Sequence, residues 1–269
     1  MATVGERGAE VGEALAMSDR DARAARLFVI ATRLAAAGGD DALRESRALL
    51  ERAAADGSPY AALELGIMMA AGSGGAADPE GGLAWVVRAA EAGLATAAVL
   101  LGGTLIGRAE HAAAGIPWLR RAAAAEEWSA LWLLGAAYLR GLGVTRDAAQ
   151  ARMLFQTAAQ NGVVEAQVEL AAMYGAGVGG ARDEQSAARW ERAAADAGHP
   201  GACMRVADRT MAQPGRAALA LPWLLRAAEA GSAAAAERLA VLYSDGRELS
   251  RDEDAAAHWR ARADELRLR

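Results

Sequence analysis

A short motif recurs along this chain at steps of 33 or 36 residues, and this period constrains the fold more than any other feature. The motif is leucine or valine followed by glycine or alanine, with another alanine four residues earlier. A second motif, most often tryptophan a few residues before a double alanine, alternates with the first. A chain with such a period stacks similar units, because one unit alone cannot bury its apolar face. The first motif begins at Leu65, Leu101, Leu134, Leu170, Val206 and Leu239.

Residues 130–162 form the clearest unit of the repeat. Two apolar segments of helical length flank a glycine-rich loop with Gly141 and Gly143, and Asp147 opens the second segment. Gly162 closes that segment, since a glycine just past a helix end adopts the left-handed conformation at little steric cost. The pattern predicts an all-α protein built from helix–loop–helix units.

These residues resemble the Sel-one-like repeat family, a relative of the tetratricopeptide solenoids, over about residues 42–265. The resemblance implies a right-handed superhelical solenoid of about six antiparallel helix pairs of 33–36 residues each, used mainly as a scaffold for assembling other proteins. Two loops depart from the family pattern. Those before Trp118 and Trp223 lack the glycine-rich motif and its aspartate and carry Pro117 and Pro222 instead, so we expect them to differ in shape.

The expected organisation has four parts. Residues 1–17 are small and polar and are expected to be flexible or loosely helical. An N-terminal capping helix is expected over 18–41, the repeat array over 42–251, and a C-terminal capping helix over 252–269. The last helix is rich in charged residues, as a terminal face exposed to water must be.

Composition limits the class of protein and its compartment. The chain is 54% hydrophobic, enough for a folded core, and its single cysteine, Cys203, excludes an intrachain disulfide framework. All 29 basic residues are arginine, typical of a GC-rich bacterial genome, and the net charge of −5 gives no nucleic-acid footprint. No signal-peptide core or membrane-spanning run is visible, so we expect a cytoplasmic protein without membrane or nucleic-acid partners, provided that Met1 is the natural start.

Few residues suggest chemistry. Residues 175–180 fit the letters of a dinucleotide-binding loop, but a helix end precedes them where that loop needs a strand. His111, His199 and His258 are far apart, and none pairs with another at a spacing that suits a metal. Cys203 is expected to be a buried small residue. We therefore expect no catalytic residues, no metal site and no cofactor. The recurring aspartates are expected to cap helices: Asp78, Asp147, Asp183 and Asp252.

Trp128 and Trp132 go beyond what the repeat requires. They lie four apart on one expected helix, at positions where other repeats carry smaller residues. One interpretation is packing against the unusual loop nearby. The other is an exposed anchor for a partner, rimmed by Arg120, Arg121 and Arg140, because interface hot spots are enriched in tryptophan and arginine. The sequence leaves both interpretations open.

The function expected from the sequence is that of a non-enzymatic scaffold or adaptor that binds a protein or peptide along the concave face of the array. The main alternative is a recognition or regulatory subunit that docks on an enzyme encoded nearby. An enzyme with a cryptic site in the groove ranks last, since no nucleophile–base or metal constellation is visible. Self-association is left open.

Overall fold

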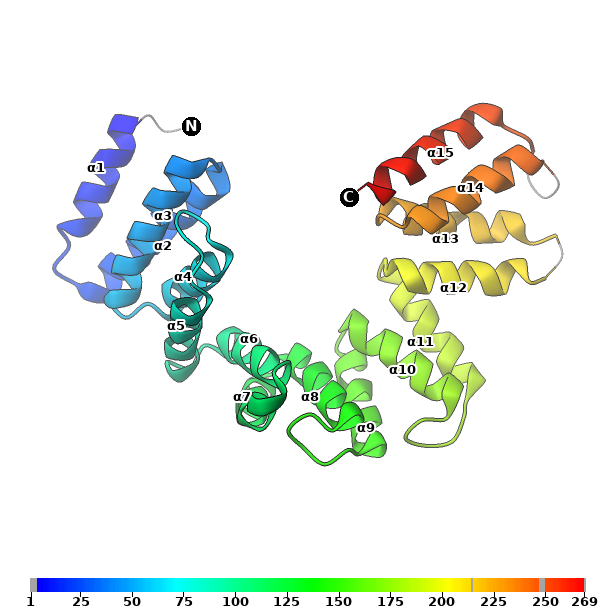
Figure 1. Cartoon of the computed structure of the whole chain (residues 1–269), viewed down its shortest axis with the longest axis horizontal. Coiled ribbons are helices and arrows are strands. Elements are labelled where there is room, and N and C mark those ends of the chain that lie inside the picture. Colours follow the sequence, from blue (N-terminus) through cyan, green and yellow to red (C-terminus); the bar gives the residue numbers. More distant parts are fainter. Residues whose placement is uncertain (1–3, 214, 247–249, 269) are drawn as a thin grey trace. The chain divides into compact units, whose positions relative to one another are not determined.

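The computed structural model describes residues 4–213, 215–246 and 250–268, with side chains from residue 8 onward. Within these ranges the regular elements are fifteen α-helices and one short 3₁₀ helix, Ala109–His111, and no strand (Figure 1). The α-helices are α1 (Val4–Leu15), α2 (Arg20–Ala37), α3 (Asp40–Ala55), α4 (Pro59–Ala71), α5 (Pro79–Glu91), α6 (Ala95–Ile106), α7 (Ala112–Ala124), α8 (Trp128–Arg140), α9 (Ala148–Gln160), α10 (Val164–Ala176), α11 (Glu184–Asp196), α12 (Pro200–Met211), α13 (Ala217–Glu229), α14 (Ala233–Asp245) and α15 (Glu253–Arg267).

Most neighbouring helices pack as antiparallel pairs. We call the even-numbered helices from α4 to α14 the A helices and the odd-numbered helices from α5 to α15 the B helices, and one A helix with the next B helix makes one repeat. The strongest contacts join α2 to α3, α4 to α5, α6 to α7, α10 to α11, α12 to α13 and α14 to α15 (Figure 1). This packing confirms the predicted all-α fold of stacked helix pairs.

The chain divides into two compact units. Unit 1 comprises Met1–Ala137 with Gly141–Thr145, and unit 2 comprises Tyr138–Arg140 with Arg146–Arg269. In each unit more than half of the helices bury one large apolar side chain completely among alanines, as expected for stacked amphipathic helices. These side chains are Leu27, Leu50, Leu65, Leu101 and Leu119 in unit 1, and Phe155, Leu170, Leu224 and Leu239 in unit 2.

Small residues set how closely the two helices of a pair approach. In α4–α5 the crossing is made by Gly66 and Gly82, and a Cβ built on Gly66 would lie 2.6 Å from the Gly82 carbonyl oxygen. In α10–α11 the equivalent positions are Ala171 and Ala187, which are 7% and 6% exposed. Because backbone lies against backbone at the first crossing, no side chain fits there.

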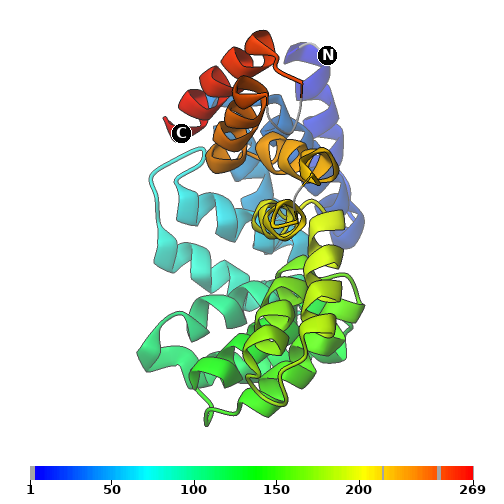
Figure 2. The ribbon, with the colours of Figure 1, turned by 90° about the vertical axis from the view of Figure 1, so that its right-hand side faces the viewer.

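The glycine-rich loops have a structural role. In the loop between α10 and α11, Gly179 has φ of +72°, and a Cβ on it would lie 2.2 Å from the Ala148 carbonyl oxygen at the start of α9. Arg152 of α9 donates to the Ala181 carbonyl oxygen at 3.2 Å. The α4–α5 loop packs on α3 in the same way (Figure 2, in cyan). The glycines at 175–180 therefore let a loop pack against a helix end, and a helix, α10, precedes them as expected.

The aspartates cap helices as predicted. Asp147 accepts from Gln150 N at 2.9 Å, and Asp78 and Asp252 make the equivalent bonds. Asp183 accepts from Ser186, whose hydroxyl and backbone N–H hold the pKa of that carboxyl below its usual value. These carboxylates satisfy N–H groups that a helix start leaves free.

Pro117 and Pro222 lie inside helices α7 and α13 and not in the loops where the sequence led us to expect them. The connections before these helices lack the capping aspartate, and neither helix has a side-chain cap at its start. The short 3₁₀ helix occupies the connection before α7. This connection therefore differs in shape because it lacks the capping aspartate and because its repeat is three residues shorter than the 36-residue repeats. Pro117 lies in the helix that follows it.

The N-terminal helices continue the pairing. Most of the segment expected to be flexible or loosely helical forms α1, whose Glu10 pairs with Arg33 of α2 at 3.0 Å; mobility of this segment stays a prediction. α2, the expected cap, packs on α3 as a further helix pair. Arg23 of α2 donates to both carboxylate oxygens of Asp56 at 2.6 and 2.7 Å, which lowers the pKa of Asp56. At the other end, α15 is the second helix of the last pair.

Candidate functional site

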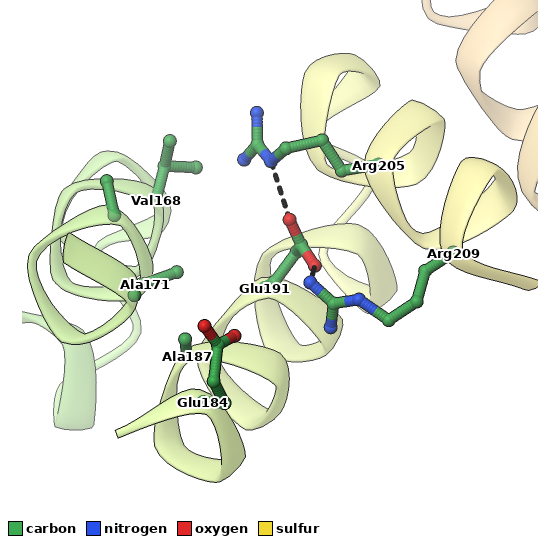
Figure 3. Close-up of a pocket in the computed structure, with 9 residues that line it drawn as sticks. Val168, Ala171, Glu184, Ala187, Glu191, Arg205 and Arg209 are labelled. Carbon is green, nitrogen blue, oxygen red and sulfur yellow. Dashed lines mark hydrogen bonds and ion pairs between the residues drawn. The ribbon is translucent and has the colours of Figure 1, made fainter. Parts of the chain in front are cut away.

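A pocket of about 300 Å³ opens between the A helices α10 and α12, with the B helix α11 as its floor (Figure 3). α10 contributes small apolar side chains, and α11 and α12 contribute charged ones. We call this pocket the charged groove. Its lining residues are Val168, Ala171, Ala172, Gly175, Glu184, Ala187, Glu191, Arg205 and Arg209.

Glu191 is the most unusual residue of the charged groove. It is 5% exposed and stands directly after the tryptophan of its B helix, at a position that is apolar in the neighbouring repeats. Burying a carboxylate is costly unless it is paired. A glutamate in this column, which is apolar in every other B helix before α15 and holds the exposed Arg260 in α15, is a sequence feature that could have pointed to the groove. The equivalent apolar residues, all 4% exposed or less, are Leu50, Val86, Leu119, Phe155 and Leu224.

Two arginines of α12 compensate the buried Glu191 carboxylate. Arg205 Nε donates to Glu191 Oε1 at 2.7 Å, and Arg209 Nη2 lies 2.5 Å from Oε2 as an ion pair outside hydrogen-bond angles (Figure 3). Their side chains are 46% and 52% exposed. Arg209 also departs from the repeat, because Met68 and Met173 occupy its column in two other A helices. An Arg–Glu–Arg cluster thus replaces an apolar core contact.

A second pocket of about 240 Å³ adjoins the first at Arg209 and is basic. Arg192 of α11 and Arg216 before α13 also line it, and no carboxylate of the described residues does. Arg192 lies over the Trp223 ring at 4.5 Å and pairs with Asp196 at 3.4 Å. The two adjoining pockets of unit 2 are therefore lined by four arginines, one on α11, two on α12 and one before α13.

The same groove exists in unit 1 with different chemistry. A pocket of about 310 Å³ lies between the A helices α4 and α6 over the B helix α5. Val86, Leu100 and Thr104 stand there at the positions that Glu191, Arg205 and Arg209 occupy in unit 2. We call it the apolar groove. Two of its side chains are large, apolar and open to solvent: Ile67 at 44% and Leu100 at 39%.

The family follows from the repeat itself. A family model for the Sel1 repeat matches residues 59–94, 128–163, 164–199, 217–232 and 233–263, more than half of the chain. The chain belongs to the Sel1 repeat family. The resemblance expected from the sequence is therefore confirmed. Four of the five matched ranges each cover one A helix and all or most of the following B helix, and the range 217–232 contains the B helix α13 alone.

Two curated relatives share part of this Sel1 array. One, from Rhizobium meliloti (strain 1021), is called an exopolysaccharide production negative regulator and is 35% identical over 148 residues, covering 47% of this chain and 55% of its own. The other carries the same name in Rhizobium leguminosarum bv. viciae and is 48% identical over 65 residues, or 24% of each chain. The chain thus spans about half the length of the first relative and a quarter of the second.

Solved structures agree with the Sel1 fold. A Sel1 repeat protein from Oxalobacter formigenes superposes with a TM-score of 0.72 at 25% identity, covering 97% of this chain and 83% of that one. The protective antigen c5321 of uropathogenic Escherichia coli, described as having an SLR fold, gives a TM-score of 0.65 at 23% identity over 97% and 62% of the two chains. The second likeness concerns the fold alone.

Trp128 and Trp132 lie on α8 of the Sel1 array, and both are half-buried. Trp128 is the first residue of the helix. The Trp132 indole Nε1 is buried and has no acceptor among the residues that the structure describes. Neither tryptophan lines the charged or the apolar groove. Their intermediate exposure is compatible with packing and with partner binding, so the anchor stays a prediction. Residues of the Trp132 column are half-buried in every Sel1 repeat: Leu63, Val99, Val168, Met204 and Glu237.

The three arginines expected around this pair are all exposed. Arg121 lies over Trp118 of its own helix at 5.7 Å from the ring, and its Nη2 donates to the Glu91 carbonyl oxygen at 3.4 Å. Arg120 neighbours it on α7, and Arg140 lies in the last turn of α8. The guanidinium of Arg121 is thus engaged by the packing of the Sel1 repeats.

Glu126 is strained, two residues before Trp128. It has φ of +62°, the one positive value found for a residue other than glycine in the described chain. A non-glycine residue in this left-handed region costs about 1–2 kcal/mol. The turn before Trp128 therefore carries a conformational cost that the equivalent turns of the other repeats do not. The equivalent turns all use glycine: Gly57, Gly93, Gly162, Gly198 and Gly231.

The other candidate residues have structural roles or stand alone. His199 caps α12, with Nδ1 accepting from Ala202 N at 3.1 Å. Cys203 is buried, and burial raises the pKa of its thiol, which opposes a nucleophilic role. Among the described residues no three histidine, cysteine, aspartate or glutamate side chains cluster as a metal site would require. In the same part of the chain, no helix combines the length and apolar character needed to cross a bilayer.

Proposed function

We propose that this Sel1 repeat protein is a non-enzymatic scaffold that binds another protein or a peptide along the grooves between its A helices. One observation carries the proposal: two grooves of equal size at equivalent positions differ in chemistry, Val86 and Leu100 in one and Glu191 and Arg205 in the other. The positions of the helix crossing stay small in both, as Gly66 and Gly82 in one groove and Ala171 and Ala187 in the other. Variation in the side chains that line the groove around a constant crossing, buried at 86 and 191 and exposed at 100 and 205, suits recognition of a partner.

The chemistry of the grooves supports binding rather than catalysis. In the charged groove the buried carboxylate of Glu191 is compensated by two arginines, and the described residues that line the groove include no serine, cysteine or histidine to act as a nucleophile or base. The apolar groove offers Ile67 and Leu100, which suit contact with an apolar side chain of a partner.

A second candidate is a recognition or regulatory subunit that docks on an enzyme encoded nearby. The name of the two relatives, exopolysaccharide production negative regulators, favours it. In this version the grooves bind the regulated enzyme and contribute no chemistry themselves. If so, addition of this chain will change the rate of a captured enzyme, whereas a passive scaffold will leave that rate unchanged.

Affinity capture with groove variants tests the scaffold. The bait is the full chain, and the readout is the amount of the most abundant specific partner. We expect Leu100→Asp or Arg205→Glu to reduce recovery at least about tenfold, as loss of a contact worth roughly 1.4 kcal/mol or more requires. Val241→Asp is the matched control, since Val241 is 62% exposed on an A helix and lines neither groove. Equal recovery with all variants would contradict the proposal.

The same capture experiment tests the tryptophan anchor, which we retain as a second part of the proposal together with Arg120, Arg121 and Arg140 as its rim. Trp128→Ala with Trp132→Ala should abolish recovery while leaving Tm nearly unchanged, because an interface anchor contributes about 2 kcal/mol or more to binding. A loss of about 3–5 kcal/mol in the free energy of unfolding would instead assign both side chains to the core.

A further inference from the structure

The two arginines of the charged groove keep most of their donors free. Arg205 uses Nε for Glu191 and Arg209 uses Nη2, while each guanidinium has five N–H groups. No acceptor within the described residues is recorded for the others. Figure 3 shows the remaining nitrogens of Arg205 pointing away from Glu191, and the unused end of the Arg209 guanidinium on the other side of that carboxylate. The structure thus presents unused arginine donors on α12 in the same pocket as the small apolar side chains of α10.

The charge balance of the charged groove and its neighbouring pocket leaves room for an anion. Four arginines line the two pockets, against two glutamates, and one of the four, Arg192, is paired with Asp196 outside the pockets. Glu184 is already paired with Arg182 at the rim, and Glu191 is already paired with Arg205 and Arg209. One further carboxylate would complete the pairing of the two α12 arginines. This excess of positive charge is local, because the whole chain has a net charge of −5.

We propose that the charged groove binds an acidic side chain of a partner peptide, whose carboxylate accepts hydrogen bonds from the outward N–H groups of Arg205 or of Arg209. This inference rests on the proposed scaffold function. Arginine and carboxylate match in geometry and form charge-assisted, bidentate hydrogen bonds. Val168, Ala171 and Ala172 form the apolar side of the groove, where the aliphatic part of a glutamate side chain or its neighbour packs.

A carboxylate suits the groove better than a nucleic-acid backbone does. Glu184 and Glu191 line the same pocket, and their negative charges oppose a polyanion, which must bring several phosphates close together. A single acidic side chain brings one charge. The volume of about 300 Å³ also fits one side chain and its neighbour rather than a larger ligand.

Selection from a phage-displayed library of random peptides, about twelve residues long, on the full chain tests this inference. We expect selected peptides to be enriched in glutamate and aspartate. Their Kd should rise at least about tenfold in Arg209→Ala or in Arg205→Ala, as loss of a charge-assisted bond requires. It should also rise between about 50 mM and 500 mM salt, since exposed ionic contacts are screened.

Two further variants guard against effects on folding and net charge. Arg238→Ala removes an arginine from the same column as Arg205, on α14 and outside both pockets, and should leave Kd unchanged. Glu191→Val, Arg205→Leu and Arg209→Thr together copy the apolar groove of unit 1 into unit 2. This triple variant should stay folded by circular dichroism and lose the acidic peptides.

Each other outcome overturns the inference. Peptides without acidic enrichment, or with a Kd that is insensitive to Arg205 and Arg209 but raised by Leu100→Asp, would leave the scaffold function intact and place binding in the apolar groove. Failure to select any peptide would also reject it, while capture of a folded partner tests the scaffold separately. Binding of a labelled single-stranded DNA that Arg209→Ala abolishes would assign the groove to nucleic acid. Arginine-dependent dimers in light scattering would assign it to a second copy.

Discussion

Removing both arginines from the buried carboxylate, Arg205→Ala with Arg209→Ala, should lower the free energy of unfolding by about 3 kcal/mol at neutral pH. Glu191 is 5% exposed and would be left as an uncompensated charge. Breaking a buried ion pair from one side costs about 3–5 kcal/mol, and the open pocket beside Glu191 admits water, so we expect the lower end of that range. Urea unfolding followed by circular dichroism measures the change.

The matched control removes the whole cluster. The triple change Glu191→Val, Arg205→Leu and Arg209→Thr replaces it with the residues of the apolar groove, so no charge is left buried. Replacement of a buried ion cluster by apolar residues is often neutral or stabilising by about 1–4 kcal/mol. We therefore expect the triple variant to be at least as stable as the natural chain. Equal losses in the double and triple variants would mean that packing, and not the uncompensated charge, dominates at this position.

The second large effect is expected at the crossing of α4 and α5. Gly66→Ala would place a Cβ 2.6 Å from the Gly82 carbonyl oxygen and 2.8 Å from Val86 Cγ2, so the two helices must separate. Overpacking of this kind costs about 1–3 kcal/mol. Because the same helices form the apolar groove, the variant should also weaken any ligand that depends on Leu100. Urea unfolding again measures the loss.

Gly175→Ala is the control on α10. A Cβ there would meet only Ala187 Cβ at 3.7 Å, an ordinary contact. Inside a helix, alanine in place of glycine stabilises by roughly 0.5–1 kcal/mol, so this variant should unfold at a higher urea concentration than the natural chain. If Gly66→Ala and Gly175→Ala changed the free energy of unfolding in the same direction, the close crossing at Gly66 would not explain the effect of Gly66→Ala.

The repeat was predictable from the sequence because its columns reflect simple packing rules. The alanine four residues before each Leu-Gly or Leu-Ala pair is buried in every repeat, as in Ala166 and Ala235, and the aspartates cap helices as expected. Period and helix type follow from such local preferences summed over many units. The glycine-rich letters at 175–180 could likewise be assigned to a loop, because a helix precedes them.

The glutamate in an otherwise apolar column marks an unusual position, but the grooves themselves were not predicted, because they depend on which side chains of three successive helices meet. In its local sequence, Glu191 looks like any charged residue on a surface helix. Its role becomes clear only from its buried position and from its pairing with Arg205 and Arg209. Pro222 was misplaced for a related reason. The sequence marks a loop without its usual motif but does not say where the next helix begins, and α13 starts five residues earlier, at Ala217. Helix boundaries are the least reliable part of such reasoning.

Site-specific photocrosslinking tests the proposed scaffold function most directly. p-Benzoylphenylalanine would be placed in the grooves, at Leu100 or Ala172, and on exposed B-helix positions outside them, at Met153 or Leu219, which are 64% and 60% exposed. The account predicts that at least one groove position crosslinks to the captured partner and that both B-helix positions do not. Crosslinks from Met153 or Leu219 with none from either groove position would contradict it.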